Sequence, residues 1–183
     1  MPNDTSLLQA ARKLQPQALA AIFDLYASAI FKYSLRLCGD PIEADNVVGD
    51  VFARLLDQLA AGKGPRTNLR AYLYQIAYHV VVDHAREMHQ VVPLEGIWDR
   101  QDGNLSIAGA IEDKALLDAV LSSINLDLTP DQRHVVILRF IEDFSPQETA
   151  NILDKTVDNV KVIQSRAIAK LRQVLSQHSD EDK

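Results

Sequence analysis

Residues that suit DNA binding gather on one side of a helix expected near the C-terminus. Lysine and arginine bind phosphates or guanine, asparagine can read adenine, and valine can contact a thymine methyl group. The outward face of this helix is expected to hold Asn159, Lys161, Val162, Ser165, Arg166, Ala169 and Arg172. Between Val157 and Arg172, four basic residues stand against a single acidic one, Asp158, so the helix is locally positive. The pattern predicts contact with duplex DNA, although a solvated surface helix can share this composition.

Two helices with clearly marked starts precede this helix and would position it. Thr129–Gln132 and Ser145–Glu148 each combine a hydroxyl cap, a proline at the first helical position and a Gln or Glu at the third. The second helix is expected to end near Leu153, because Asp154-Lys155-Thr156 breaks the pattern. Thr156 can then cap a longer helix from Val157 to about Leu175. A short helix, a three-residue turn and a longer helix form a helix-turn-helix.

A second set of residues with binding chemistry lies in the N-terminal half. Arg70, Tyr74, Gln75 and Tyr78 are expected to form an outward stripe on a helix from about Asn68 to Met88. Aromatic faces and cations are what unstacked bases need. The alternative is that the tyrosines pack on a neighbouring helix. The buried stripe of this helix is expected to comprise Leu69, Leu73, Ile76, Ala77, Val80 and His84.

Two more helices are expected before it. The first, from about Pro16 to Leu37, has a broad apolar face of Leu19, Ile22, Phe23, Tyr26, Ile30, Tyr33 and Leu37. The second starts at the capping sequence Asp40–Glu43, runs to about Ala60 and ends before Gly62–Pro65. Its inward residues are expected to be Val47, Val48, Val51, Phe52, Leu55, Leu56 and Leu59, and its outward residues Asn46, Gly49, Asp50, Arg54 and Asp57.

Composition and charge set the architecture. The chain has 183 residues, 47% of them hydrophobic, with only 7 Gly and 7 Pro, which favours an all-α protein of two small helical domains. Val91–Gly109 is acidic and lacks a sustained helical period, so we expect a flexible linker at residues 91–110. This linker would join a domain at 1–90 to a domain at 111–183. The second domain is expected to begin with a helix over about 111–124. The net charge of −6 means that any DNA contact must come from a local patch.

Several function classes find no support in the residues. Cys38 is the single cysteine, and no Cys/His cluster has zinc spacing. His79, His84 and His89 recur every five residues, which spreads them around a helix by about 140° per step rather than along one face. No long apolar run, signal peptide, phosphate-binding loop or nucleophile elbow is recognised. We therefore expect a cytoplasmic protein that is not an enzyme and has no cofactor, no metal and no membrane contact.

Two segments resemble a known family. Leu128–Leu175, which contains the helix-turn-helix, resembles region 4 of bacterial sigma-70-family factors. Gly39–Leu56 followed by Leu69–Arg86 resembles their region 2. Because both segments occur in the family's order and nothing like region 3 stands between them, the resemblance is to the small extracytoplasmic-function (ECF) group.

The resemblance implies roles for particular residues. The helix matching Ala44–Leu56 would dock on the β′ clamp helices of core RNA polymerase through Asn46, Gly49, Asp50 and Arg54. The loop and helix matching Gly64–Arg86 would bind the melted minus-ten element of promoter DNA as a single strand, through Arg66, Asn68, Arg70, Tyr74, Gln75 and Tyr78. The last helix would read the minus-thirty-five element as duplex through Asn159, Lys161, Val162, Ser165 and Arg166.

The chain also departs from the family's pattern. Gly49 replaces a usual glutamine, Tyr72 a tryptophan and Tyr78-His79 an Arg-Asn pair, and one arginine remains in a normally basic tail. Fewer cations predict weak, salt-sensitive promoter binding. Asp154 takes the place of a turn glycine, so we expect its φ to be positive.

Two other functions remain open at this point. One is a helix-turn-helix regulator that binds duplex DNA without polymerase. The other is a sigma-like protein held mainly by an anti-sigma factor. The apolar residues Val91, Val92, Leu94, Ile97 and Trp98 could serve such a contact or packing between the two domains, and packing is the favoured interpretation.

Overall fold

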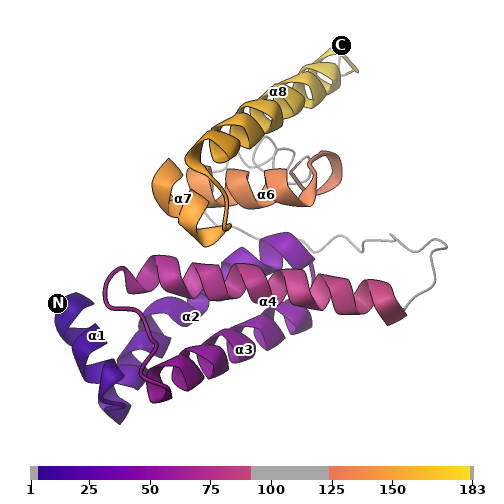
Figure 1. The fold of residues 1–183 in the computed structure, drawn as a ribbon. Coiled ribbons are helices and arrows are strands. Elements are labelled where there is room, and N and C mark those ends of the chain that lie inside the picture. The colour runs from indigo at the N-terminus through magenta and orange to yellow at the C-terminus, as the bar shows by residue number, and fades with distance from the viewer. Residues whose placement is uncertain (1–3, 92–123, 182–183) are drawn as a thin grey trace, which may run out of the picture. The chain divides into compact units, whose positions relative to one another are not determined.

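The structure, a computed structural model, describes residues 4–91 and 124–181, and every regular element in these ranges is helical (Figure 1). The N-terminal unit contains α1 (Asp4–Arg12), α2 (Pro16–Cys38), α3 (Pro41–Ala60) and α4 (Leu69–Val91). The C-terminal unit contains α6 (Pro130–Val136), the π-helical segment η1 (Ile137–Ile141), α7 (Pro146–Ile152) and α8 (Val157–Glu181). The chain divides into two compact units, Met1–Gln101 and Asp102–Lys183. The all-α class with two helical units is confirmed.

Two sequence expectations fall mostly outside the described residues. The predicted linker at residues 91–110 is described only at Val91, where α4 ends, and the predicted helix at 111–124 only at Ile124. The domain boundaries therefore stay predictions.

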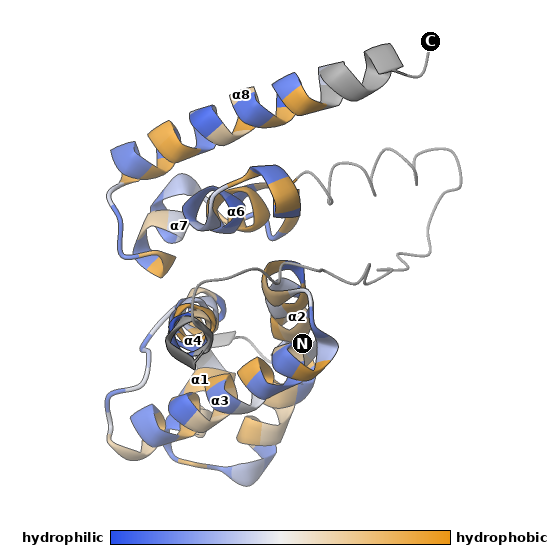
Figure 2. Ribbon diagram, turned by 90° about the vertical axis from the view of Figure 1, so that its right-hand side faces the viewer, coloured by the Kyte–Doolittle hydropathy of each residue, from blue (hydrophilic) through white to orange (hydrophobic). Residues whose placement is uncertain are grey.

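In the N-terminal unit, α2, α3 and α4 pack against one another, and α1 packs on α2 and α3. The start of α3 is as predicted, because the Asp40 carboxylate accepts hydrogen bonds from the backbone N–H groups of Ile42 (2.7 Å) and Glu43 (3.1 Å). The Glu43 side chain turns toward α4, where its carboxylate contacts His84, so the capping box that the sequence suggested is not formed. Hydrophilic and hydrophobic residues are interleaved along α3 and α8, as expected of helices with one buried face (Figure 2).

Three burial assignments made from the sequence for aliphatic and aromatic residues are wrong, and a fourth, that of His84, is described with the site below. Phe23 and Leu56 were expected to be buried but are 47% and 43% exposed. Phe23 lies at the margin of the buried face of α2, where its ring contacts that of Phe52 at 4.8 Å between centroids. Tyr74 was expected to face outward but is fully buried, since α4 packs against both α2 and α3 and so buries a wider face than one stripe.

Among the described helices, α2 is long and apolar enough to cross a membrane by length and composition. No such segment is expected from the sequence. Ile22, Ile30 and Tyr33 of α2 are buried inside the N-terminal unit. Because the core helix of a globular unit can meet the same criteria, this is a weak indication of a membrane span.

The C-terminal unit confirms the predicted helix starts. Thr129 and Ser145 both form complete capping boxes, with Gln132 and Glu148 respectively. The end of α7 confirms the turn prediction, because Asp154 has a φ of 52° and the N–H of Lys155 donates to the carbonyl of Ala150 at 2.9 Å. This is the Schellman arrangement that follows a left-handed residue. The turn therefore directs the chain from α7 into α8.

Candidate functional site

The residues predicted to read duplex DNA all lie on the exposed side of α8. These five residues, Asn159, Lys161, Val162, Ser165 and Arg166, form what we call the recognition face. Val160 and Ala167, on the opposite side, are fully buried. A surface hollow of about 370 Å³ lies along the same helix, beside Lys161 and Ser165. The division of α8 into a packed and an open side is therefore confirmed.

Polar contacts within the unit hold α8 in position. Arg139 of η1 donates to the backbone carbonyl of Phe144 and, at 3.2 Å, to the side-chain oxygen of Gln164 on α8. Lys155 in the turn forms an ion pair with Asp131 of α6 at 3.0 Å. The Thr156 hydroxyl accepts from the N–H of Asn159 at 3.2 Å, as expected of a cap. Both the start and the middle of α8 are thus anchored.

The residues predicted to bind polymerase are also exposed. Asn46, Gly49, Asp50 and Arg54 lie on the open side of α3, and we call them the docking face. Val47 and Val51 on the other side of the helix are buried. Open space surrounds the position that a Cβ at Gly49 would take, so packing does not require glycine there.

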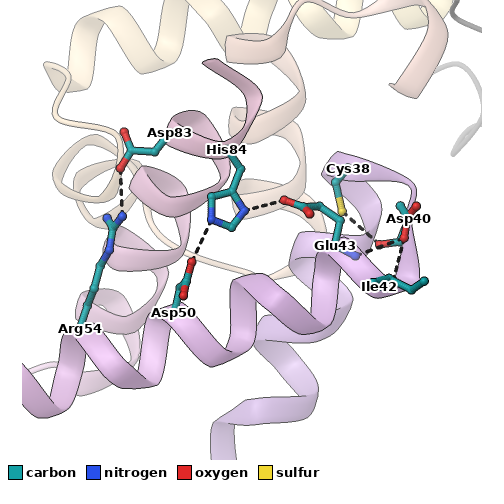
Figure 3. Close-up of polar contacts among 8 residues, drawn as sticks. All are labelled: Cys38, Asp40, Ile42, Glu43, Asp50, Arg54, Asp83 and His84. Carbon is teal, nitrogen blue, oxygen red and sulfur yellow. Dashed lines mark hydrogen bonds and ion pairs between the residues drawn. The ribbon is translucent and has the colours of Figure 1, made fainter. Parts of the chain in front are cut away.

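Two docking-face residues are paired with α4 (Figure 3). The Arg54 guanidinium donates to Asp83 at 3.1 Å. His84 lies between two carboxylates, with Nδ1 2.5 Å from Glu43 Oε1 and Nε2 2.9 Å from Asp50 Oδ2. Partial burial lowers the pKa of His84, but the hydrogen bonds and charges of Glu43 and Asp50 outweigh it, so the net pKa lies above its ordinary value. The expectation that His84 is part of the buried stripe is therefore wrong.

A side chain of α1 holds the loop that precedes α4. The Arg12 guanidinium donates to the carbonyls of Gly64 (2.9 Å) and Pro65 (3.1 Å). A Cβ at Gly64 would lie 2.5 Å from Leu59 Cδ2, so a larger residue there would require the Leu59 side chain to shift. The neighbouring Arg66 is exposed. Asn68, with a φ of 48°, accepts from the N–H of Ala71 at 3.1 Å and so caps α4.

The predicted single-strand stripe is divided by the packing of α4. Tyr74 packs on Tyr33 of α2, with 5.1 Å between ring centroids, and cannot stack on a base without leaving the core. The Arg70 guanidinium carbon lies 5.3 Å from the Tyr74 ring centroid, within the range of a cation–π contact. Gln75 and Tyr78 are partly exposed. The alternative of packed tyrosines thus holds for Tyr74.

The structure brings Arg54 and Gln75, predicted to bind different partners, into one hollow. This hollow of about 350 Å³ lies between α3 and α4, and its lining includes Arg54, Gln58, Tyr72, Gln75 and His79. Tyr72 and His79 were noted in the sequence only as departures from the family. Burial raises the pKa of the Tyr72 hydroxyl, so it stays a neutral donor.

Three positioning residues, Arg12, Asp83 and Arg139, were not predicted from the sequence. No local pattern marks them, because their partners are distant in sequence or are backbone carbonyls. A signal for the bridging role of His84 does exist, since Glu43 and Asp50 are seven residues apart and thus share a face of α3. Among the described residues, no group of three metal-ligating side chains is placed to hold an ion. The Cys38 thiol is half-buried, and burial raises its pKa.

Comparisons with known proteins agree with this geometry. Residues 22–89 match the family "Sigma-70 region 2", and residues 126–173 match "Sigma-70, region 4". The RNA polymerase sigma-E factor of Streptomyces coelicolor is 31% identical over 149 residues, a match that covers 80% of both chains. The ECF RNA polymerase sigma factor BldN of the same organism is 26% identical over 175 residues. That match covers 92% of this chain and 64% of BldN, so the chain spans less than two thirds of that relative.

A solved structure shows the same fold. The sigma factor RpoE of Bartonella quintana, co-crystallised with the anti-sigma factor NepR, matches with a TM-score of 0.66 at 20% identity. The match covers 86% of this chain and 96% of RpoE. The two matched family regions and both relatives point to the same family. The chain therefore belongs to the sigma-70 family of RNA polymerase sigma factors and, within that family, to the ECF group.

Proposed function

We propose that this protein binds core RNA polymerase and directs it to promoters. The observation that carries the proposal is the recognition face, because all five of its residues are exposed on a helix whose start and middle are anchored. A helix-turn-helix presents its second helix to the major groove in this way. Asn159 and Arg166 offer side chains for base edges, and Lys161 offers a charge for phosphate.

Polymerase binding is assigned to the docking face. The four residues of the docking face share the open side of α3, so one partner surface, such as the β′ clamp helices, can contact all of them. Arg54 and Asp50 offer charges of opposite sign, which fix the register of two helices better than one sign does. A regulator that binds duplex DNA alone would have no use for this face.

Capture of the melted strand is assigned to the loop and the first turns of α4. Arg66 and Asn68 are exposed in the loop that Arg12 holds, and Arg70, Gln75 and Tyr78 follow on α4. Tyr74 contributes from the core by supporting the Arg70 guanidinium. With two arginines in this set, binding depends on salt, as expected of phosphate contacts.

The protein acts by binding, and the chemistry of RNA synthesis belongs to the polymerase. We assign it to the cytoplasm, where polymerase and promoters are found. No cofactor or metal takes part in this function.

A paired measurement of polymerase affinity and run-off transcription tests the assignment. Arg166→Ala should lower promoter-dependent transcription by about five- to 150-fold, because a bidentate base contact is worth about 1–3 kcal/mol, while leaving polymerase affinity intact. Asp50→Arg should do the reverse and remove polymerase binding, while the recognition face keeps its DNA preference. If Asp50→Arg binds polymerase normally and Arg166→Ala transcribes normally, these assignments fail.

Gly49→Gln, on the same docking face, is expected to strengthen polymerase binding rather than weaken it. The substitution introduces the residue usual in the family, and a Cβ at this position meets no atom within 4 Å. Replacing glycine inside a helix should stabilise α3 by about 0.5–1 kcal/mol, and the amide should strengthen docking. A fall in polymerase affinity would show that the face is read differently from that of the family.

An anti-sigma protein is a second partner that one observation favours. Phe140 and Ile141 of η1 are 55% and 37% exposed, which places two adjacent apolar side chains on the surface of the C-terminal unit. Such residues are available to a protein that covers the unit. Pull-down from cell extract with the wild-type chain and with Phe140→Ser as baits tests this candidate. Equal capture of an anti-sigma protein by both chains would argue against this surface.

The domain division at residues 1–90, 91–110 and 111–183 is also part of the proposal. The matched regions end at residue 89 and begin at residue 126, which supports it. Limited proteolysis should cut first between Val91 and Gly109. Cleavage that starts inside either helical unit would overturn the division.

A further inference from the structure

The contacts of His84 require both of its ring nitrogens to carry protons. Glu43 Oε1 lies 2.5 Å from Nδ1, and Asp50 Oδ2 lies 2.9 Å from Nε2. Ionised carboxylates only accept hydrogen bonds, whereas a neutral imidazole has one donor and one acceptor nitrogen. The neutral ring could therefore satisfy only one of the two contacts. The geometry in Figure 3 is that of an imidazolium bridging two carboxylates.

We propose that His84 is a positioning residue for polymerase docking, whose protonated ring holds the Asp50 carboxylate in place on the docking face. The inference rests on the proposed function, because it takes α3 as the polymerase-binding helix. It goes beyond that function in making a residue of α4 control the docking face. We call this arrangement the Glu43–His84–Asp50 bridge.

The bridge leaves Asp50 able to bind a partner. Only Asp50 Oδ2 contacts the imidazole, and the Asp50 side chain is 51% exposed, so its other oxygen can still accept from a donor on polymerase. A carboxylate held in one rotamer loses less conformational freedom on binding than a free one. Loss of the proton would free Asp50 and leave two carboxylates without the cation between them. Docking would then be weaker.

Other charged groups surround the bridge on each element packed there. On α3 these are Glu43 and Asp50 themselves. At the junction of α2 and α3, Asp40 caps α3 and the Cys38 thiol contacts the Asp40 carbonyl at 3.4 Å. On α4, Asp83 is neutralised by Arg54, while Arg86 and Glu87 are exposed and opposite in charge. The negative side chains of α3 dominate at His84, which favours its protonated form.

The direction of the pH dependence follows from this arrangement. The pKa of His84 is raised in the folded protein, so the bridge is fully formed below the ordinary pKa of histidine and is lost as pH rises through the raised value. Polymerase affinity should therefore be highest in mildly acidic buffer and should fall toward alkaline pH.

The first test measures affinity of the full chain for core polymerase from pH 6 to pH 8.5. The wild-type affinity should fall by about two- to tenfold across this range, the cost expected for ordering one side chain. His84→Gln, which cannot carry a charge, should bind at every pH as the wild-type protein does at pH 8.5. Asp45→Asn, which removes an exposed carboxylate of α3 outside the bridge, should keep the wild-type slope.

A double-variant comparison separates positioning from a merely structural role. If His84 acts through Asp50, then His84→Gln should have no further effect on affinity once Asp50→Asn is present. A direct measurement is the NMR titration of the His84 ring in the free protein, which should show both nitrogens protonated at pH 6.5 and a lower pKa in Asp50→Asn.

The outcomes distinguish this inference from the proposed function. If Asp50→Arg abolishes polymerase binding while the wild-type protein and His84→Gln show the same pH slope, the bridge does not control docking and only this inference fails. If Asp50→Arg binds polymerase normally, the docking face itself is misassigned. A neutral His84 ring at pH 6.5 would also overturn the inference.

Discussion

Two histidines, one in each unit, show how surroundings decide the charge of the same side chain. His84 lies at the edge between α3 and α4, where Glu43 and Asp50 stabilise its cationic form. His134 lies in α6 and is 4% exposed. Burial lowers the pKa of His134 to about 4, with Arg133 and Lys155 also lowering it and Asp131 opposing them. Acid should therefore strengthen one unit at its edge and weaken the other in its core.

The largest expected effect comes from acid on the C-terminal unit. The unfolded chain takes up a proton at His134 near pH 6.5, whereas the folded unit does so only near pH 4. Stability is therefore lost as pH falls through this window, by up to about 3 kcal/mol. His134→Leu should remove most of this loss.

Amide hydrogen exchange of peptides from each unit, corrected for the intrinsic rates, measures this difference within the full chain. The C-terminal unit should lose protection between pH 6.5 and pH 4 in the wild-type protein and much less in His134→Leu. Equal acid sensitivity of the wild type and His134→Leu would mean that His134 is not held neutral, and the contrast with His84 would break.

Local signals in the sequence predicted the helix starts and the turn correctly. The caps at Asp40, Thr129 and Ser145 depend on residues within three positions of one another. The positive φ of Asp154 follows from the same short range, because it closes α7 through backbone hydrogen bonds to that helix. The exposed sides of α3 and α8 could also be predicted, since a helix with one buried face leaves its other face open.

The errors all come from contacts between helices. Tyr74 is buried because Tyr33, forty-one positions earlier in the chain, packs against it. His84 belongs to the edge rather than the core because Glu43 and Asp50 lie opposite it. Phe23 lies at a margin that depends on how far α3 covers α2. Hydrophobic periodicity marks which way a residue points from its own helix, but the neighbours decide whether it is covered.

The next prediction concerns Arg139, which links parts of the C-terminal unit as the ion pairs link α3 and α4, but in a less exposed place. Its guanidinium donates hydrogen bonds to the Phe144 carbonyl and to the side chain of Gln164. Arg139→Ala should lower the free energy of unfolding of the C-terminal unit by about 2 kcal/mol, because charged hydrogen bonds in a partly buried place are lost. Arg166→Ala, an exposed arginine on the same unit, is the matched control and should change stability little.

Hydrogen exchange in the C-terminal unit reports both arginine variants. Equal stability of Arg139→Ala and Arg166→Ala would contradict the anchoring role assigned to Arg139. It would also mean that the C-terminal unit relies on its apolar core alone to hold α8.

A smaller effect with the opposite sign is expected at the turn. Asp154 has a φ of 52°, a conformation that costs a non-glycine residue some strain. Asp154→Gly should therefore be neutral or stabilise the C-terminal unit by up to about 1 kcal/mol, the relief of strain being partly offset by the greater freedom of glycine when unfolded. Asp154→Val should destabilise it, since a β-branched residue tolerates this region poorly. Thermal unfolding of both variants checks the order, and a valine variant more stable than the glycine variant would contradict it.

The smallest effect is expected from the exposed pair on the N-terminal unit. Arg54 and Asp83 are 3.1 Å apart, but their side chains are 44% and 43% exposed, so water and salt screen their attraction. Asp83→Asn should lower the free energy of unfolding by less than about 1 kcal/mol, and the difference should shrink further in concentrated salt. Arg139→Ala should keep its larger effect at the same salt concentration, because its hydrogen bonds are partly shielded from solvent.

Denaturant titrations at low and high salt, followed by hydrogen exchange in each unit, measure both variants. An Asp83→Asn loss as large as that of Arg139→Ala and insensitive to salt would show that the α3–α4 edge is held as firmly as the C-terminal unit. The docking face would then be a rigid surface rather than one adjusted by its charges.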